Sequence, residues 1–325
     1  MAAKTMLSEH DLRAILANYH LGELVSFKPL TLGTVQTNCR ITTTKGVFVF
    51  RYYESRSIGS VLFESNLIRH LKRKNYPCPG LLKNRGGGYV GIFNEKPYAI
   101  FEFVEGQHLE RPTEIQQKQL IQKVAELQII TKGYKPRKTE YRWNYSVDLA
   151  RELAHEAVSR IGSVNAEEKL KWFEDELAIL QLPRTLPKGV CHCDFHFSNI
   201  LFKNGEFQAL LDFDDANYTF LTYDLATLIN PFIPSFEWNT WHQFKPDDNV
   251  IDLYSAHSVA SEYAHYRALS NSEKRHLFDV YKLSILFDCI WYFERGDVRD
   301  FYERRKIGHL NRLGRDAFYD GLFGE

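Results

Sequence analysis

The sequence predicts an α+β fold with a strand-rich first part and a mainly helical second part. In the first hundred residues, β-branched and aromatic runs alternate with tight-turn residues, as is typical of antiparallel hairpins. After Gly106, apolar residues recur at helical spacing and follow capping-box sequences. A length of 325 residues suits two domains. We therefore expect one lobe over residues 1–102 and a second lobe over residues 103–325.

Local sequence patterns predict the strands and the helix of the first lobe. Thr44-Lys45-Gly46 and Asn94-Glu95-Lys96-Pro97 are turn sequences between runs of strand-forming residues. Between these two hairpins, apolar residues recur with the spacing of one helix face. The expected strands are residues 39–43, 47–53, 89–93 and 98–104, and the expected helix is residues 61–72.

The second lobe shows helix starts and one break. Thr113 with Gln116, and Asn165 with Glu168, have the spacing of a capping box, and Ser270 begins a helix expected to reach about Glu294. Proline and glycine between residues 183 and 189 end the preceding helix, and an extended segment is expected over residues 190–215.

Composition and charge exclude several classes of protein. Lys plus Arg equals Asp plus Glu, 41 against 41, so a nucleic-acid partner is disfavoured. The N-terminus lacks an apolar signal segment, and the most apolar stretch, residues 283–293, contains Asp288 and is too short to span a bilayer, so no membrane association is expected. Five scattered cysteines favour reduced thiols and a cytoplasmic location.

The densest polar cluster has the spacing His192-x-Asp194-x-x-x-x-Asn199, followed by Asp212. The Asn204-Gly205 dipeptide between them predicts a tight hairpin turn, which would bring Asn199 beside Asp212. Amide and carboxylate oxygens suit Mg²⁺, which completes its octahedron with phosphate and water. The alternative is that these acids lie on a solvated hairpin without function.

These residues resemble the catalytic loop and metal-binding aspartate of the protein-kinase-like fold. The small-molecule branch is more similar, namely the aminoglycoside phosphotransferase and choline kinase superfamily. Within it, Gly189 to Asp194 and Tyr223-Asp224-Leu225-Ala226 most resemble the bacterial homoserine kinases. The resemblance runs from about Ser8 to Asp224. It implies a bilobal protein-kinase-like fold, with an antiparallel-sheet N-lobe over residues 1–102 that would bind the nucleotide. The mostly helical C-lobe, residues 103–325, would be catalytic and bind the acceptor.

The resemblance also implies roles for single residues. Asp194 would be the base that accepts the proton of the acceptor hydroxyl, His192 would shape the loop, and Asp224 would brace it by accepting backbone N–H bonds. Asn199 and Asp212 would hold Mg²⁺ on the phosphates of ATP. The residues expected to bind the nucleotide are Gly33 and Asn38 near the phosphates, Arg51 with its partner Glu64, and Phe101 and Phe103 at the adenine.

Two features leave alternatives open. Arg51 stands where kinases of this fold commonly keep a lysine; it would contact phosphate, or else be an edge-strand arginine beside a solvated Glu64. Cys191, Cys193 and the neighbouring histidines invite a zinc interpretation, but alternating side chains on a strand point to opposite faces and do not close a tetrahedron.

A small-molecule alcohol is the expected acceptor. Asp212 and Asp224 are only 12 residues apart, which leaves little room for the activation segment that docks a peptide in protein kinases. Asp288 lies on an otherwise apolar helix face, where a carboxylate needs an internal cation or the cation of a ligand. Further residues assigned to the acceptor are His196, Asp214 and Trp238, the last of which would otherwise pack in the core.

The sequence therefore predicts an ATP- and Mg²⁺-dependent small-molecule kinase, with homoserine as the first choice of acceptor. Kinases of aminoglycosides, choline or another small alcohol are the alternatives of the same class. A nucleotide-binding, pseudokinase-like sensor without transfer activity is the alternative of another class, favoured only by Arg51 and by the single glycine, Gly33, of the phosphate loop.

Overall fold

The computed structural model describes residues 4–30, 35–109, 111–195, 197–230 and 251–324. The chain forms two compact units that alternate along the sequence. The first consists of residues 1–109, 135–142 and 196–216, and the second of residues 110–134, 143–195 and 217–325. The lobe boundary at residue 102 stays a prediction.

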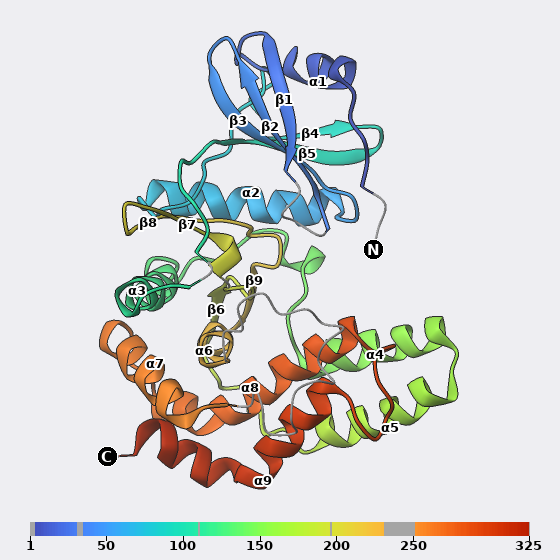
Figure 1. Cartoon of the computed structure of the whole chain (residues 1–325), viewed down its shortest axis with the longest axis vertical. Helices are drawn as coiled ribbons and strands as arrows, with labels where there is room; N and C mark the ends of the chain where they lie inside the picture. Colours follow the sequence, from blue (N-terminus) through green and yellow to red (C-terminus); the bar gives the residue numbers. More distant parts are fainter. Residues whose placement is uncertain (1–3, 31–34, 110, 196, 231–250, 325) are drawn as a thin grey trace. The chain divides into compact units, whose positions relative to one another are not determined.

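A five-stranded antiparallel sheet forms the core of the first unit (Figure 1), with the strand order β1-β2-β3-β5-β4. The two predicted hairpins are confirmed. Helix α1 packs on β1, and buried aliphatic and aromatic residues join them; this helix and β1 were not predicted. The elements are α1 (Glu9–Leu16), β1 (Leu24–Leu30), β2 (Thr37–Thr43), β3 (Gly46–Tyr52), α2 (Ile58–Arg73), β4 (Val90–Phe93) and β5 (Lys96–Glu102).

Two later segments complete the first unit. The hairpin of β7 (Ile200–Lys203) and β8 (Glu206–Leu210) follows a single turn, η2 (Phe197–Asn199), and η1 (Thr139–Tyr141) packs on α2. The predicted turn at Asn204-Gly205 is confirmed, since both residues have positive φ, 53° and 82°. The expectation of one extended segment over residues 190–215 was wrong, because residues 192–195 form a loop and Phe197–Asn199 a 3₁₀ turn.

Helices dominate the second unit, which confirms the predicted fold class. Its helices are α3 (Glu114–Ile130), α4 (Val147–Ile161), α5 (Val164–Ala178), α6 (Thr222–Ile229), α7 (Leu253–Tyr266), α8 (Asn271–Trp291) and α9 (Tyr302–Phe323). Helix α8 is the central one, buried on most of its surface against α4, α6 and α9. A two-stranded antiparallel sheet pairs β6 (Lys188–Cys191) with β9 (Asn217–Phe220).

Helix starts follow the capping chemistry. Thr113 and Ser270 form the expected capping boxes with Gln116 and Glu273. The predicted cap at Asn165 was wrong. Ser163 caps α5 instead, and the Asn165 side chain donates to the Gly296 carbonyl and accepts the Val298 N–H. A polar side chain inside a helix was thus mistaken for its start.

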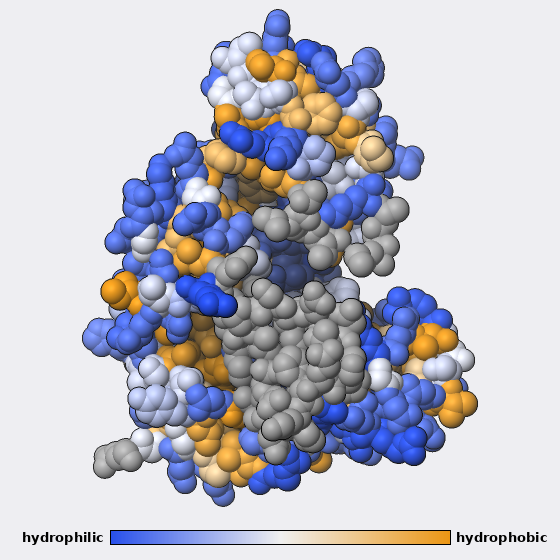
Figure 2. Space-filling model, in the orientation of Figure 1, coloured by the Kyte–Doolittle hydropathy of each residue, from blue (hydrophilic) through white to orange (hydrophobic). Residues whose placement is uncertain are grey.

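The surface over α5 is mainly hydrophilic in Figure 2, as expected of a helix that buries only one stripe. Among the helices of the described ranges, none combines the length and the hydrophobicity needed to cross a membrane. All five cysteines are buried and carry free thiols.

Candidate active site

The loop after β6 carries Asp194 and is built on the β6–β9 pair, in which Cys191 lies opposite Asn217. Cys193 has a φ of 65°, a left-handed conformation that turns the chain sharply after the strand. The side chains on either side of Asp194 point into the protein: His192 is fully buried and its ring lies 4.7 Å from that of Phe195. Asp194 itself is exposed. The loop thus exposes the carboxylate of Asp194 to solvent, while the neighbouring side chains are buried.

The brace expected from Asp224 is present. Its carboxylate accepts the backbone N–H groups of His192 at 3.1 Å and of Cys193 at 2.9 Å. Complete burial raises the pKa of Asp224, and these N–H bonds oppose the rise by stabilising the charged form. The loop conformation therefore depends on an aspartate at the start of α6, thirty residues further along the chain.

Sequence reasoning missed the second layer of this brace. Gln128 of α3 donates to the Leu221 carbonyl at 2.7 Å and to Asp224 at 3.3 Å, and its side-chain oxygen accepts from Tyr263 of α7 at 2.5 Å. All three side chains are buried. A glutamine within an amphipathic helix gives no spacing signal, so only the fold identifies it.

Asn199 and Asp212 lie at the open end of the β7–β8 hairpin. The backbone N–H of Leu211 donates to the carbonyl of Asn199 at 2.7 Å, which fixes the two segments side by side. Asp212 has a φ of 57°, in the left-handed region that Asp tolerates better than most residues, and its side chain is 38% exposed. Backbone strain and exposure at one carboxylate are typical of a functional position.

Arg51 bridges two carboxylates with its forked guanidinium. Nη2 lies 2.7 Å from Oδ1 of Asp212 and Nη1 lies 3.9 Å from Oε1 of Glu64 on α2. Burial disfavours the charge of Arg51, but Asp212 and Glu64 outweigh it and raise the pKa of Arg51. Burial raises the pKa of Glu64 to about 7, against the attraction of Arg51. Two different nitrogens of the guanidinium fork thus meet the two acids, and a contact of Arg51 with phosphate stays a prediction.

Asp214, assigned to the acceptor from sequence, is buried and already held on both oxygens. Oδ1 accepts from Arg56 at 3.0 Å and Oδ2 from Gln36 at 2.8 Å. Arg56 also donates to Asp215. Burial alone would raise the pKa of Asp214. The nearby charges of Arg51 and Arg56 outweigh burial, so the pKa is lowered. A contact of Asp214 with the acceptor stays a prediction.

Arg142 fixes the segment that follows Asp212. It donates to the carbonyls of Phe213 and Ala216 at 2.9 and 2.7 Å and to the Ser60 hydroxyl at 2.8 Å. The guanidinium also lies 4.9 Å from the Phe63 ring centroid. This residue, distant in sequence from Asp212, ties the chain that follows Asp212 to α2, and no sequence pattern marks it.

The predicted nucleotide residues of the first unit lie on neighbouring strands. Asn38 of β2 is directly opposite Arg51 of β3, and Phe101 of β5 is opposite Val49 of the same strand. Phe101 is buried, whereas Phe103 is half-exposed with Arg40 over its ring. Three other predicted site residues lie outside the described ranges, namely Gly33, His196 and Trp238.

Asp288 of α8 belongs to a charged cluster in the second unit. Its side chain is exposed to solvent on one side. The protein packed around it raises its pKa to about 6, with Lys306 of α9 opposing the rise and Asp194 adding to it. Glu303 of α9 is buried, and one of its carboxyl oxygens has no hydrogen-bond partner among the described residues. Lys306 donates to the Asn230 side chain. Among the described residues, the carboxyl groups of Asp194, Asp288 and Glu303 and the ammonium of Lys306 interact in this cluster. A contact of Asp288 with a ligand cation stays a prediction.

The donor set can be tested against a divalent cation. Asn199 and Asp212 supply one amide and one carboxylate oxygen, and only one oxygen of Asp212 is occupied by Arg51. Within the described part of the chain, no group of three or more His, Cys, Asp or Glu side chains is arranged to hold a metal. A magnesium site of two protein ligands, completed by phosphate and water, does not require such a group. The residues present therefore fit Mg²⁺.

Comparison with known proteins gives two findings. Residues 26–269 match the phosphotransferase enzyme family. The chain is 32% identical over 237 residues to a homoserine kinase of Chelativorans sp., covering 71% of each, and 30% identical over 276 residues to that of Rhodospirillum rubrum, covering 84% of this chain and 81% of the relative.

Solved structures show the same fold. An amicoumacin kinase in complex with AMP-PNP and Ca²⁺ aligns with a TM-score of 0.62 at 17% identity, covering 96% of this chain and 93% of that one. A spectinomycin phosphotransferase in complex with ADP aligns with a TM-score of 0.59 at 14% identity, covering 97% of both chains. A microcompartment-associated aminopropanol kinase also aligns with a TM-score of 0.59, at 13% identity, covering 97% of this chain and 95% of that one.

Proposed function

Because the chain belongs to the phosphotransferase enzyme family and is a small-molecule kinase, we propose that it transfers the terminal phosphate of ATP to the hydroxyl of homoserine. The observation that carries the choice of acceptor is the identity of about one third with homoserine kinases over more than two thirds of both chains. Free, buried thiols support the cytoplasm as its location.

We assign the chemistry to Asp194 as the base. Its carboxylate is exposed on a loop held from behind by His192 and Asp224, so it can meet a hydroxyl without local rearrangement. A positioned carboxylate that accepts the hydroxyl proton contributes about 10²–10⁴-fold to the rate.

We assign the nucleotide phosphates to Asn199, Asp212 and Arg51. When bound, Mg²⁺ would neutralise phosphate charge between Asn199 and Asp212. Arg51, poised on Asp212 and supported by Glu64, would exchange one carboxylate contact for a phosphate oxygen. The further phosphate contacts assigned from the resemblance are Gly33 and Asn38.

The adenine would meet the segment after β5. The N–H of Glu102 already donates to the Gly80 carbonyl at 2.8 Å, so hydrogen bonds to the base would come from the backbone of Phe103 and Val104. Phe101 would support the segment from the sheet, since it is buried and bridged to Leu81.

The acceptor's ammonium group is assigned to Asp288. The excess of carboxyl groups around it favours a cation, and homoserine carries an ammonium group near the hydroxyl. Lys306 of α9 is the basic residue of this cluster and would face the acceptor carboxylate. His196, Asp214 and Trp238 complete the acceptor residues that the sequence predicts.

A panel of acceptors tests the proposal. ADP release would be followed with L-homoserine, aminopropanol, choline and spectinomycin, each with Mg²⁺ and ATP, and with no acceptor. We expect kcat/KM for homoserine to exceed that of every other acceptor by at least about tenfold, which is about 1.4 kcal/mol of transition-state binding. A preference for another acceptor would refute homoserine but keep the kinase. Nucleotide binding without ADP release would favour the sensor.

A further inference from the structure

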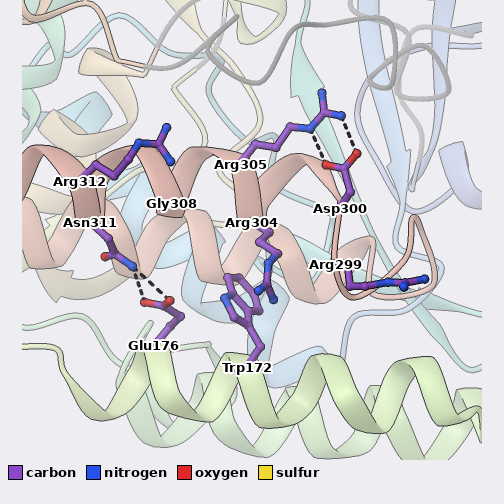
Figure 3. Close-up of a pocket in the computed structure, with 9 residues that line it drawn as sticks. All are labelled: Trp172, Glu176, Arg299, Asp300, Arg304, Arg305, Gly308, Asn311 and Arg312. Atoms are coloured by element: carbon purple, nitrogen blue, oxygen red, sulfur yellow. Dashed lines mark hydrogen bonds and ion pairs between the residues drawn. The ribbon is translucent and has the colours of Figure 1, made fainter.

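A hollow of about 400 Å³ lies in the second unit between α5 and the first half of α9, with the loop before α9 closing one end (Figure 3). None of its residues was predicted to take part in catalysis, nucleotide binding or acceptor binding. Nine residues line it: Trp172 and Glu176 from α5, Arg299 and Asp300 from the loop, and Arg304, Arg305, Gly308, Asn311 and Arg312 from α9.

The hollow has an excess of positive charge. Four arginines and two carboxylates line it, a formal charge of +2. Outside the lining, Asp297 pairs with Arg299 at 2.9 Å and Lys282 pairs with Glu176, which leaves this sum unchanged. Asp300 is already neutralised by Arg305 through two bonds of 2.6 and 2.7 Å. Glu176 lies 2.5 Å from the buried ammonium of Lys282 and accepts from the Asn311 amide at 3.2 Å. Both acids are therefore occupied by other groups.

Arg304 lies against an aromatic wall. Its guanidinium is 5.7 Å from the centroid of the Trp172 ring, and that ring also makes a perpendicular contact with the Phe301 ring, with centroids 5.0 Å apart. Figure 3 shows Arg304 beside the indole. No carboxylate within ion-pair distance of Arg304 is found in the described part of the chain. The contact with Trp172, and not an ion pair, therefore orients the guanidinium and its five N–H donors.

Gly308 keeps the hollow open. It lies inside α9, where glycine costs about 1 kcal/mol relative to alanine. A Cβ added at this position would meet only Nη1 of Arg312, at 3.6 Å, which is an ordinary van der Waals contact. Neither the backbone conformation nor a close neighbour requires glycine here. The missing side chain leaves space between the arginines that flank it, where a ligand would lie.

We propose that this hollow binds the phosphate group of a small metabolite or free phosphate. A phosphate monoester carries a charge of about −1.5 to −2 near neutral pH. This charge is opposite to the formal charge of +2 on the residues that line the hollow and similar in size. Guanidinium forks fit phosphate oxygens by paired hydrogen bonds, and a planar or apolar remainder would lie on Trp172. This inference does not depend on the identity of the acceptor.

Calorimetric titration tests the site in the full chain, with Mg²⁺ and ADP saturating the nucleotide residues. The ligands are inorganic phosphate and O-phosphoserine. Arg304→Gln should weaken binding by about tenfold or more, as expected for a lost charge-assisted hydrogen bond. Gly308→Leu should abolish binding by filling the space, while favouring the helix. Arg160→Gln, at the end of α4 outside the hollow, is the charge-matched control.

The outcomes separate as follows. Binding that Arg304→Gln and Gly308→Leu remove and Arg160→Gln retains would support the site, and tighter binding of O-phosphoserine than of phosphate would assign the ester. Absence of binding to the wild-type chain, or equal losses in all three variants, would overturn it. Wild-type kinase activity in Gly308→Leu would show that the variant is folded.

Discussion

Asp212 in the first unit and Asp194 in the second are supported by different kinds of interaction. Asp212 is held by the charged fork of Arg51, and its neighbour Asp214 by Arg56. The Asp194 loop is held by backbone N–H groups that donate to the buried Asp224. Arginine contacts can be exchanged for phosphate when a nucleotide binds, whereas backbone hydrogen bonds keep the loop in one conformation.

The comparison indicates that the contacts of Asp212 can change when a ligand binds, whereas the loop of Asp194 is preorganised. A site for Mg²⁺ and phosphate must hold its carboxylates before the ligand arrives without leaving them unpaired. A base must instead stay at one position with a carboxylate open to solvent. The predictions below separate these two roles, beginning with the largest effect.

Asp194→Asn should break the chemistry and leave nucleotide binding intact. The amide cannot accept the hydroxyl proton, so we expect kcat to fall by about 10²–10⁴-fold. The affinity for Mg·ATP, measured by calorimetry, should change by less than about threefold, because Asn199, Asp212 and Arg51 are untouched. Unchanged turnover would reject Asp194 as the base.

Asp212→Ala should have the opposite signature. Loss of the carboxylate should weaken metal-dependent ATP binding by about 10–100-fold, the range of one charge-assisted interaction. Binding of ATP without metal should not weaken, since Arg51 is released toward phosphate. Asp215→Ala, three residues away and paired with Arg56, is the matched control. Equal losses with and without metal would contradict the assignment of Asp212 as a metal ligand.

Local chemistry made much of the site predictable. Asp194, Asn199 and Asp212 share one short stretch, and the Asn204-Gly205 turn dictates the hairpin that brings the last two together. The capping boxes at Thr113 and Ser270 likewise use contacts within four residues. Patterns of this kind are complete within one segment, so the sequence alone reveals them.

The supporting residues could not be predicted because their partners are remote in sequence. Gln128 meets Leu221 and Tyr263, and Arg142 meets carbonyls more than seventy residues away. A lone glutamine or arginine has no periodicity that identifies its partner. The same holds for Lys306, which joins the cluster of Asp288 from a helix the acceptor argument did not use.

Acceptor binding should weaken in acid if Asp288 holds an ammonium group. Its pKa is raised to about 6, so protonation removes the negative charge as pH falls through that value. Below it, kcat/KM for homoserine should fall by about tenfold per pH unit. Asp288→Asn should lower kcat/KM at neutral pH and flatten this limb. In the part of the chain that the structure describes, the ionisable groups that interact with Asp288 are Asp194, Tyr281, Cys289, Tyr292, Tyr302, Glu303 and Lys306.

The control for this profile is an acceptor that carries no charge. With this acceptor, kcat/KM should not fall near pH 6, because no ammonium group contacts Asp288. Asp194 would still act as the base, as it does with homoserine. If kcat/KM of Asp288→Asn for homoserine fell at low pH as it does in the wild-type protein, the role of Asp288 would be contradicted. Another group would then cause the fall.

Tyr263→Phe should give the smallest effect. It tests the hydrogen bonds of Gln128 and Asp224 that support the Asp194 loop. Removing the hydroxyl leaves the buried Gln128 oxygen without its donor, which costs about 1–2 kcal/mol of unfolding free energy in denaturant titration. Amide hydrogen exchange at His192 and Cys193 should accelerate, and Mg·ATP affinity should stay unchanged. Tyr266→Phe, on the same helix with a bond to Glu262, should change stability by less than about 0.5 kcal/mol. If Tyr263→Phe weakened nucleotide binding as much as turnover, the two kinds of support would not be independent.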